Sequence, residues 1–168
     1  MASQKTIEEI KAAIDQINRN DTMAVILADN LAEVKKISLQ DLYDAMTLFT
    51  HTTSIVLEYV NLKSIGIGYN PYKMTYRIAS MFYHQIWSQY CLVEAVRSLQ
   101  EKGKRDDAYL DEVVGQFIHD VKAVFDFIVE VSENKTPDTI RMYSDKKLKT
   151  YKAVDVVTHN AKLVVSED

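Results

Sequence analysis

Arg77 and His84 form a pair whose residue types and spacing suggest chemistry. They lie seven residues apart, and the chain between Ile78 and Val93 carries no Lys, Arg, Asp or Glu. Residues seven apart fall on the same face of a helix, so both side chains can reach one ligand. A catalytic or small-molecule site at this pair is therefore one hypothesis. The surroundings of His84 are uncharged, so we expect His84 to be buried or to lie at an interface.

The pair resembles the arginine–histidine signature of HEPN-type ribonucleases, and this resemblance implies that the two residues act on an RNA phosphate. The intervening Ile-Ala-Ser-Met-Phe-Tyr lacks the polar residue that usually follows the arginine in that family. The formal net charge of −4 also disfavours RNA as a partner. We therefore keep an enzyme centred on Arg77 and His84 as the alternative and favour a protein without catalytic activity.

Histidines are the second group with possible chemistry. The chain has one in each of four expected long helices: His51, His84, His119 and His159. The first three lie near the middle of their helices, and antiparallel packing would bring helix midpoints to one level, where a metal site is conceivable. His51 and His119 nevertheless fall on the polar faces of their helices, and no Glu-x-x-His or His-x-x-x-His pair occurs. We expect His51, His119 and His159 to be solvated, and we expect no metal site and no cofactor.

Aromatic residues gather on the helix that carries Arg77 and His84. Five of them occupy heptad-related positions on one side: Tyr72, Tyr76, Tyr83, Trp87 and Tyr90. Apolar residues lie toward another side of the same helix, which is typical of a central helix or of one pressed against a second subunit. Tyr and Trp suit interfaces because each combines a large apolar area with a polar tip. We predict self-association, with a dimer favoured, or binding of a protein partner; core packing and a ligand-stacking groove are the alternatives.

A basic run near the C-terminus supports a third hypothesis. Lys146, Lys147, Lys149 and Lys152 follow Arg141 and could bind an acidic partner or nucleic acid. Positive charge on one solvated helix face is the more ordinary interpretation. The overall negative charge makes nucleic acid the less favoured partner.

Composition favours helices as the elements that position these residues. Of 168 residues, 47% are hydrophobic, and only four are Gly and two are Pro, too few for the corners of a β-sandwich. The length suits one domain, spanning residues 1–168. The single Cys91 excludes an intrachain disulfide, and the first residues lack an apolar leader. No apolar run is long enough and free enough of polar residues to span a membrane, so we expect a cytoplasmic protein.

Apolar residues three and four apart mark the individual helices. We predict a shorter N-terminal pair within residues 1–37, with the first helix following Thr6 and the second carrying Met23 to Ile37. Ser38 caps a long helix with the stripe Leu39 to Val60, and a second long helix runs from Pro71 to about Lys102, before Gly103. A third long helix carries the stripe from Leu110 to Val131.

The segment after Thr136-Pro137-Asp138 is ambiguous. A cap and a proline at its start favour a fourth long helix, but the valine-rich tail could form a hairpin from Lys152 to Val165 around His159-Asn160. We favour the helix and keep strand after Thr150 as the alternative. The expected fold is all-α: an up-down four-helix bundle over residues 38–168, with the N-terminal helical pair added to it.

The whole pattern, with its uncharged stretch from Met81 to Cys91, resembles small archaeal helical-bundle proteins that have no assigned activity. This resemblance implies a helical bundle and contributes no site residues.

Overall fold

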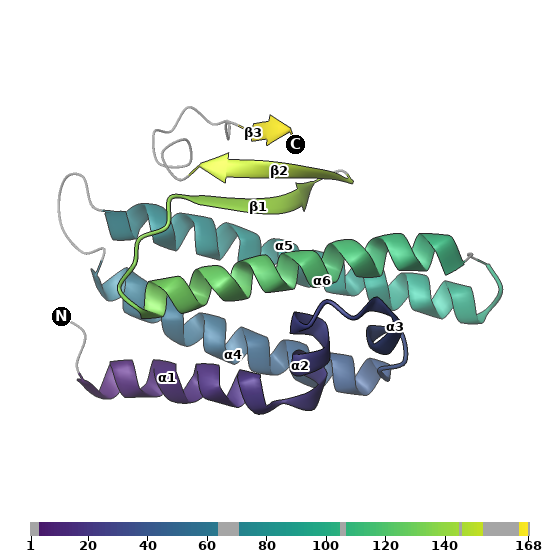
Figure 1. Ribbon diagram of the computed structural model, residues 1–168, viewed down its shortest axis with the longest axis horizontal. Helices are drawn as coiled ribbons and strands as arrows, with labels where there is room; N and C mark the ends of the chain where they lie inside the picture. Colours follow the sequence, from purple (N-terminus) through teal and green to yellow (C-terminus); the bar gives the residue numbers. More distant parts are fainter. Residues whose placement is uncertain (1–3, 64–70, 105–106, 145, 153–164, 168) are drawn as a thin grey trace.

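The protein consists of helices followed by a small C-terminal sheet (Figure 1), as given by a computed structural model that describes residues 4–63, 71–104, 107–144, 146–152 and 165–167. The helices are α1 (Gln4–Arg19), α2 (Asp21–Leu27), α3 (Leu31–Val34), α4 (Leu39–Lys63), α5 (Pro71–Glu101) and α6 (Asp107–Ser132). The strands are β1 (Thr139–Ser144), β2 (Lys147–Lys152) and β3 (Val165–Glu167). The predicted helical character is confirmed up to residue 132. No described helix is long and apolar enough to cross a membrane.

The long helices begin and end where local chemistry stabilises their ends. The Ser38 hydroxyl accepts the N–H of Asp41 at 3.1 Å and so caps α4. Just after the C-terminal end of α5, Gly103 adopts a φ of 71°. There the N–H of Lys104 bonds to the carbonyl of Leu99 at 2.8 Å. A left-handed glycine just after a helix is the usual way to end it. These predicted boundaries are confirmed.

The core lies between four helices, α1, α4, α5 and α6, which lie side by side in Figure 1. Every residue of the stripe predicted for α6 is buried: Leu110, Val114, Phe117, Val121, Val124, Ile128 and Val131. The stripe of α4 is buried from Leu42 to Val60. Burying one stripe of each helix supplies most of the stabilisation, at about 25 cal/mol for each Å² of apolar surface removed from water.

The predicted second helix, Met23 to Ile37, is wrong in one respect, because the structure divides it into α2 and α3. Asp29 adopts a φ of 59°, and the Asn30 side chain accepts the N–H of Glu33 at 3.3 Å, which starts a new helix. Short polar side chains such as Asp and Asn tolerate the left-handed conformation and cap helices, so two of them in succession interrupt a helical pattern.

The predicted fourth long helix after Asp138 is also wrong. Residues 139–144 and 147–152 form an antiparallel hairpin in which Ser144 pairs with Lys147 and Thr139 with Lys152. Burial in β1 alternates, with Ile140 and Met142 inside and Arg141 exposed, which is the period of a strand with one covered face. The hairpin therefore lies earlier than the Lys152–Val165 alternative. His159 and Asn160 lie outside the described residues.

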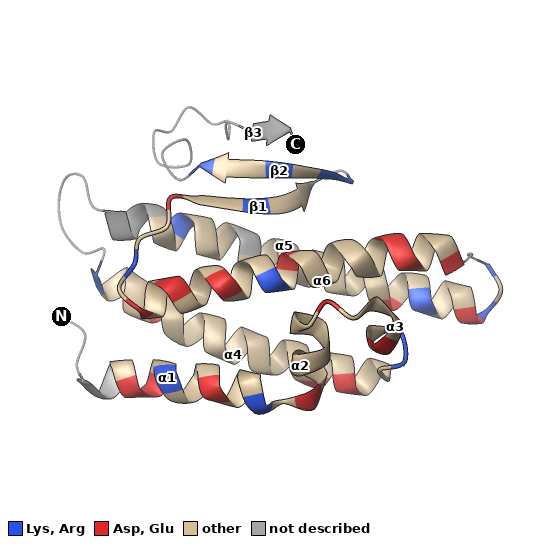
Figure 2. Cartoon of the chain, viewed as in Figure 1, with Lys and Arg blue, Asp and Glu red and all other residues tan. Residues whose placement is uncertain are grey.

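The sheet has the strand order β1-β2-β3, and β1 packs on α6 (Figure 1). Ile140, Met142 and Tyr151 are the buried residues of the hairpin. Figure 2 shows that the hairpin carries Lys and Arg, whereas acidic residues are spread along α1 and α6. The basic run therefore lies on a hairpin. Its predicted location on a helix face is wrong. At its turn, Lys146 Nζ lies 3.8 Å from Glu112 of α6 and 5.8 Å from the centroid of the Tyr109 ring.

Candidate functional site

The aromatic residues of α5 take up different environments in the structure. Tyr90 is buried, and its ring lies 6.5 Å from that of Phe117, so it belongs to the core. Trp87 is half-buried and donates its indole N–H to the Thr50 hydroxyl of α4 at 2.9 Å. Tyr76 and Tyr83 are also half-buried, whereas the side chain of Tyr72 lies outside the described residues. Most of the predicted interface thus contributes to packing within the chain, and Tyr90 has too little exposed surface to contact a partner.

Arg77 and His84 are both exposed on the outside of α5. Burial of His84 in the core of the chain, one of the two expected environments, is therefore wrong. The ring of Tyr83 lies edge-on to that of His84, with 5.2 Å between centroids. A location at an interface and an action on a phosphate group both stay predictions.

The candidate metal ligands His51, His84 and His119 lie on α4, α5 and α6. Within the described parts of the chain, no three His, Cys, Asp or Glu side chains come close enough together to hold a metal ion. The structure therefore does not bring these three histidines into one site. His119 has a different neighbour, the carboxylate of Asp120.

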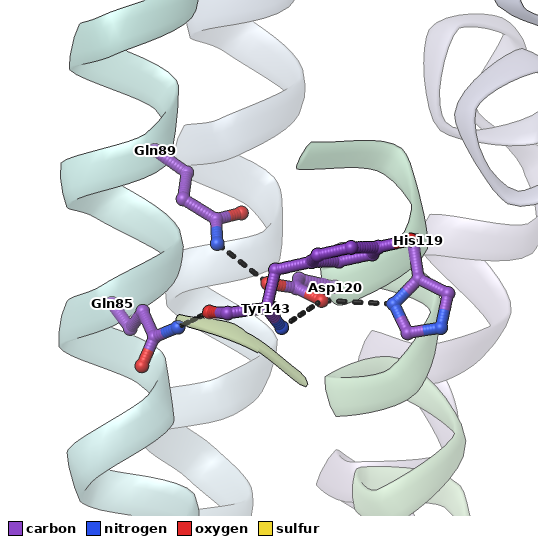
Figure 3. Close-up of polar contacts among 5 residues, drawn as sticks. All are labelled: Gln85, Gln89, His119, Asp120 and Tyr143. Carbon is purple, nitrogen blue, oxygen red and sulfur yellow. Dashed lines mark hydrogen bonds and ion pairs between the residues drawn. The ribbon is translucent and has the colours of Figure 1, made fainter. Parts of the chain in front are cut away.

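Asp120 is the buried centre of a polar cluster that joins α5, α6 and β1 (Figure 3). Its side chain is fully buried, and both carboxylate oxygens accept the N–H of Tyr143 at 3.1 Å. Gln89 of α5 donates its amide N–H to Oδ2 at 2.5 Å, and His119 Nδ1 lies 2.9 Å from Oδ1. One turn earlier on α5, Gln85 donates to the carbonyl oxygen of Tyr143. Side chains of two helices therefore bind both backbone polar groups of one residue in β1.

These contacts explain why β1 can lie against the helices at this point. A buried backbone N–H or C=O without a partner costs roughly 1–3 kcal/mol. The N–H and C=O of Tyr143 are directed at Asp120 and Gln85 and not at the neighbouring strand β2. The cluster thus supplies the hydrogen bonds that an additional strand would otherwise make along this edge of the sheet.

Burial raises the pKa of the Asp120 carboxyl above its usual value of 3.8, because the charged form loses its hydration. The hydrogen bonds from His119, Gln89 and Tyr143 act in the opposite direction and stabilise the carboxylate. Gln89 Oε1 is buried and has no hydrogen-bond partner among the described residues. Rotation of the Gln89 amide would offer this oxygen to a proton on Asp120, so the cluster has an acceptor for the protonated form as well.

The raised pKa gives a prediction for stability against pH. The folded protein holds the Asp120 proton more tightly than the unfolded chain does, so the free energy of unfolding should fall as pH rises from about 4 through the raised pKa. The slope from one such group is at most about 1.4 kcal/mol per pH unit. Urea unfolding of the wild type and of Asp120→Asn between pH 4 and pH 8 measures this, and we expect the stability advantage of the wild type to shrink with rising pH. An unchanged difference would refute it. Asp126→Asn, at an exposed position of α6, is the control.

Next to the cluster, His119 opens onto a surface cleft of about 440 Å³ between α6, β1 and the turn at Asp29. Lys122 and Arg141 line the cleft together with the carboxylates of Asp126 and Glu130. The cleft therefore presents charges of both signs, with an imidazole at its edge.

The structure is that of a helical protein whose C-terminal sheet is attached through a buried carboxylate. Comparison with protein-family models, with curated protein sequences and with solved structures finds no match. The resemblance to archaeal helical-bundle proteins therefore remains one of sequence pattern.

Asp120 is not among the candidate residues predicted from sequence, although its position carries a signal. Asp120 lies three residues after Phe117 and four before Val124, so it occupies the apolar stripe of α6. A charged residue within a buried stripe must be paired or hydrogen-bonded, which marks it for attention. What the sequence could not provide is its partner Tyr143, because that segment was predicted to be helical.

Proposed function

We propose that the protein is an up-down helical bundle that forms a homodimer through the outside of α5, a surface without a catalytic role. The surface in question, the α5 outer face, consists of the exposed residues His84, Ser88, Cys91, Leu92 and Ala95. It replaces the aromatic face predicted from sequence. Of that face, Tyr83 and Trp87 are half-buried neighbours, and Trp87 bonds to Thr50 of α4.

The observation that carries this proposal is the absence of charge along the α5 outer face. From Ile78 to Val93, α5 has no Lys, Arg, Asp or Glu, and at 1.5 Å per residue this is roughly 24 Å of helix. A helix face that stays in water usually carries charged residues. The exposed side of α1 is an example in this chain, with Glu8, Lys11, Asp15 and Arg19. An exposed face without such residues favours burial against a partner.

Exposed apolar side chains lie on the α5 outer face and beside α5. Leu92 is 44% exposed, and Tyr43 of α4 is 51% exposed. Tyr43 lies close to α5, because it lines a shallow groove together with Tyr90 and Glu94. Tyrosine is among the residues that contribute most to interfaces, and the exposed Leu92 adds apolar area. A second copy of the chain is the simplest partner, since the same surface can then bury itself around a two-fold axis.

Charge introduced into the α5 outer face should separate the subunits. In Ser88→Lys with Leu92→Lys, two lysines would lose their hydration against apolar surface, and we expect the dimer dissociation constant to rise at least about 100-fold. Sedimentation equilibrium across micromolar concentrations measures the constant. Both positions are exposed, so the monomer should keep its fold, which circular dichroism checks.

The matched control is Ala12→Lys with Gln16→Lys, at two exposed positions four apart on α1. This pair adds the same charge at the same helical spacing and should leave the dissociation constant unchanged. A wild-type protein that stays monomeric at several hundred micromolar would disprove the proposal. So would equal weakening by both pairs, because the effect would then come from net charge alone.

A further inference from the structure

His119 is held in a fixed orientation by two contacts. Its Nδ1 lies 2.9 Å from Oδ1 of Asp120, a carboxylate that Gln89 and the backbone of Tyr143 hold in place. The ring of Tyr143 meets the imidazole edge-on, with 5.1 Å between centroids and 83° between planes. The imidazole therefore keeps one orientation without depending on solvent.

The contact with Asp120 also determines which nitrogen remains available. An ionised carboxylate only accepts hydrogen bonds, so Nδ1 of the neutral imidazole must carry the proton, and Nε2 must carry the lone pair. Figure 3 shows Nε2 pointing away from Asp120. The His119 side chain is 39% exposed, whereas that of Asp120 is fully buried. The basic nitrogen is therefore accessible, while the group that orients it is shielded.

His119 is not needed to attach the hairpin. The backbone groups of Tyr143 are bound by Asp120 and Gln85, and no hydrogen bond joins His119 to the backbone of β1 within the described residues. A carboxylate that holds Nδ1 while Nε2 faces outward is the arrangement that enzymes use for a general base. In this protein, His119 lines the same cleft as Lys122 and Arg141.

We propose that His119 is an acid–base site in which Nε2 takes a proton from, or attacks, a small polar molecule bound in the cleft, with Asp120 as the positioning residue. The cleft contains Lys122 and Arg141 as well as Asp29, Asp126 and Glu130. Charges of both signs fit a small zwitterion, whose anionic group would face the cations and whose amine would face the carboxylates. This site lies on α6 and β1 and is independent of the dimer surface on α5.

The first test is the tautomer of His119 by long-range proton–nitrogen NMR at neutral pH. We expect the Nδ1–H form in the wild type. In Asp120→Asn the amide N–H can donate to Nδ1, which favours the Nε2–H form. A wild-type His119 in the Nε2–H form would overturn the proposal, because Nε2 would then have no lone pair to offer.

The second test is hydrolysis of p-nitrophenyl acetate. Nε2 attacks the acetyl carbon and p-nitrophenolate leaves, which gives an acetyl-imidazolium that keeps its Nδ1 proton. Water then cleaves the acetyl-imidazolium, releasing acetate and two protons and restoring neutral His119. We expect His119→Ala to lower the protein-dependent rate at least about tenfold, and Asp120→Asn to do the same through the tautomer. His51→Ala replaces an exposed histidine that contacts no carboxylate within the described chain, and should change the rate little.

Binding of a zwitterion is tested with glycine, which carries only the two charged groups. We expect glycine to shift the His119 NMR signals of the wild type and to leave those of His84 unchanged. Equal rates in wild type and His119→Ala, or equal loss in His119→Ala and His51→Ala, would overturn the acid–base role. Absence of any glycine-dependent shift at millimolar concentrations would overturn the zwitterion as ligand.

Discussion

Replacing Asp120 with alanine is expected to lower the free energy of unfolding by about 3 kcal/mol. The substitution removes the acceptor for the Tyr143 N–H and for the Gln89 amide, both of which would be left without a partner in a water-poor site. Removing the buried charge offsets part of this loss, because the carboxylate no longer has to be desolvated. Urea unfolding followed by circular dichroism at pH 7 measures the difference.

Two variants separate this effect from a general loss of side-chain atoms. Asp120→Asn keeps an oxygen for the Tyr143 N–H and should cost clearly less than Asp120→Ala. Asp126→Ala, at an exposed position on the same helix, should change stability by less than about 0.5 kcal/mol. If Asp120→Ala were as stable as the wild type, the cluster would not hold the hairpin against the helices.

Replacing Phe117 with alanine is expected to cost about 3–5 kcal/mol, because it leaves a cavity in the centre of the core. Phe117 has no exposed surface and packs against Tyr90, so α6 and α5 both lose contacts. A domain of this kind has about 5–15 kcal/mol of stability in total, so the variant should unfold at a much lower urea concentration.

Tyr43→Ala is the control for Phe117→Ala, since Tyr43 is also aromatic but half of its surface is exposed. It should cost less than about 1 kcal/mol in the monomer. Equal costs at the two positions would contradict the placement of Phe117 in the core. A dimer would add a second effect at Tyr43, so the comparison is best made at low protein concentration.

The helices of the core could be predicted from sequence because each buries a single stripe. In α4 and α6 the apolar residues recur every three to four positions, and the Ser38 and Gly103 signals mark ends that the structure confirms. Local rules suffice there, since periodicity and capping depend only on nearby residues.

The C-terminal sheet could not be predicted in the same way. Ile140 and Tyr143 are three apart and fit a helical stripe, yet in β1 they point to opposite faces. The choice between the two depends on contacts far away in sequence: Met142 is buried in the core, and Asp120 accepts the Tyr143 N–H. Strand preference is decided by such packing more than by the local residues.

For the candidate sites too, the sequence predicts which helix carries a residue but not the packing around it. Sequence spacing correctly placed Arg77 and His84 on one helix, but their exposure depends on how α5 packs. His119 was expected to be solvated, and it is partly exposed. Its orientation by Asp120 required the structure, because adjacent residues of a helix ordinarily point in different directions.

The buried carboxylate of Asp120 binds the backbone of β1 and so attaches the sheet to the helices. Amide hydrogen exchange at Tyr143 tests it most directly. We predict that the Tyr143 N–H exchanges at least about 100-fold more slowly than in an unstructured peptide, and that Asp120→Ala removes this protection while α6 stays protected. Fast exchange at Tyr143 in the wild type, or full protection in Asp120→Ala, would contradict the claim.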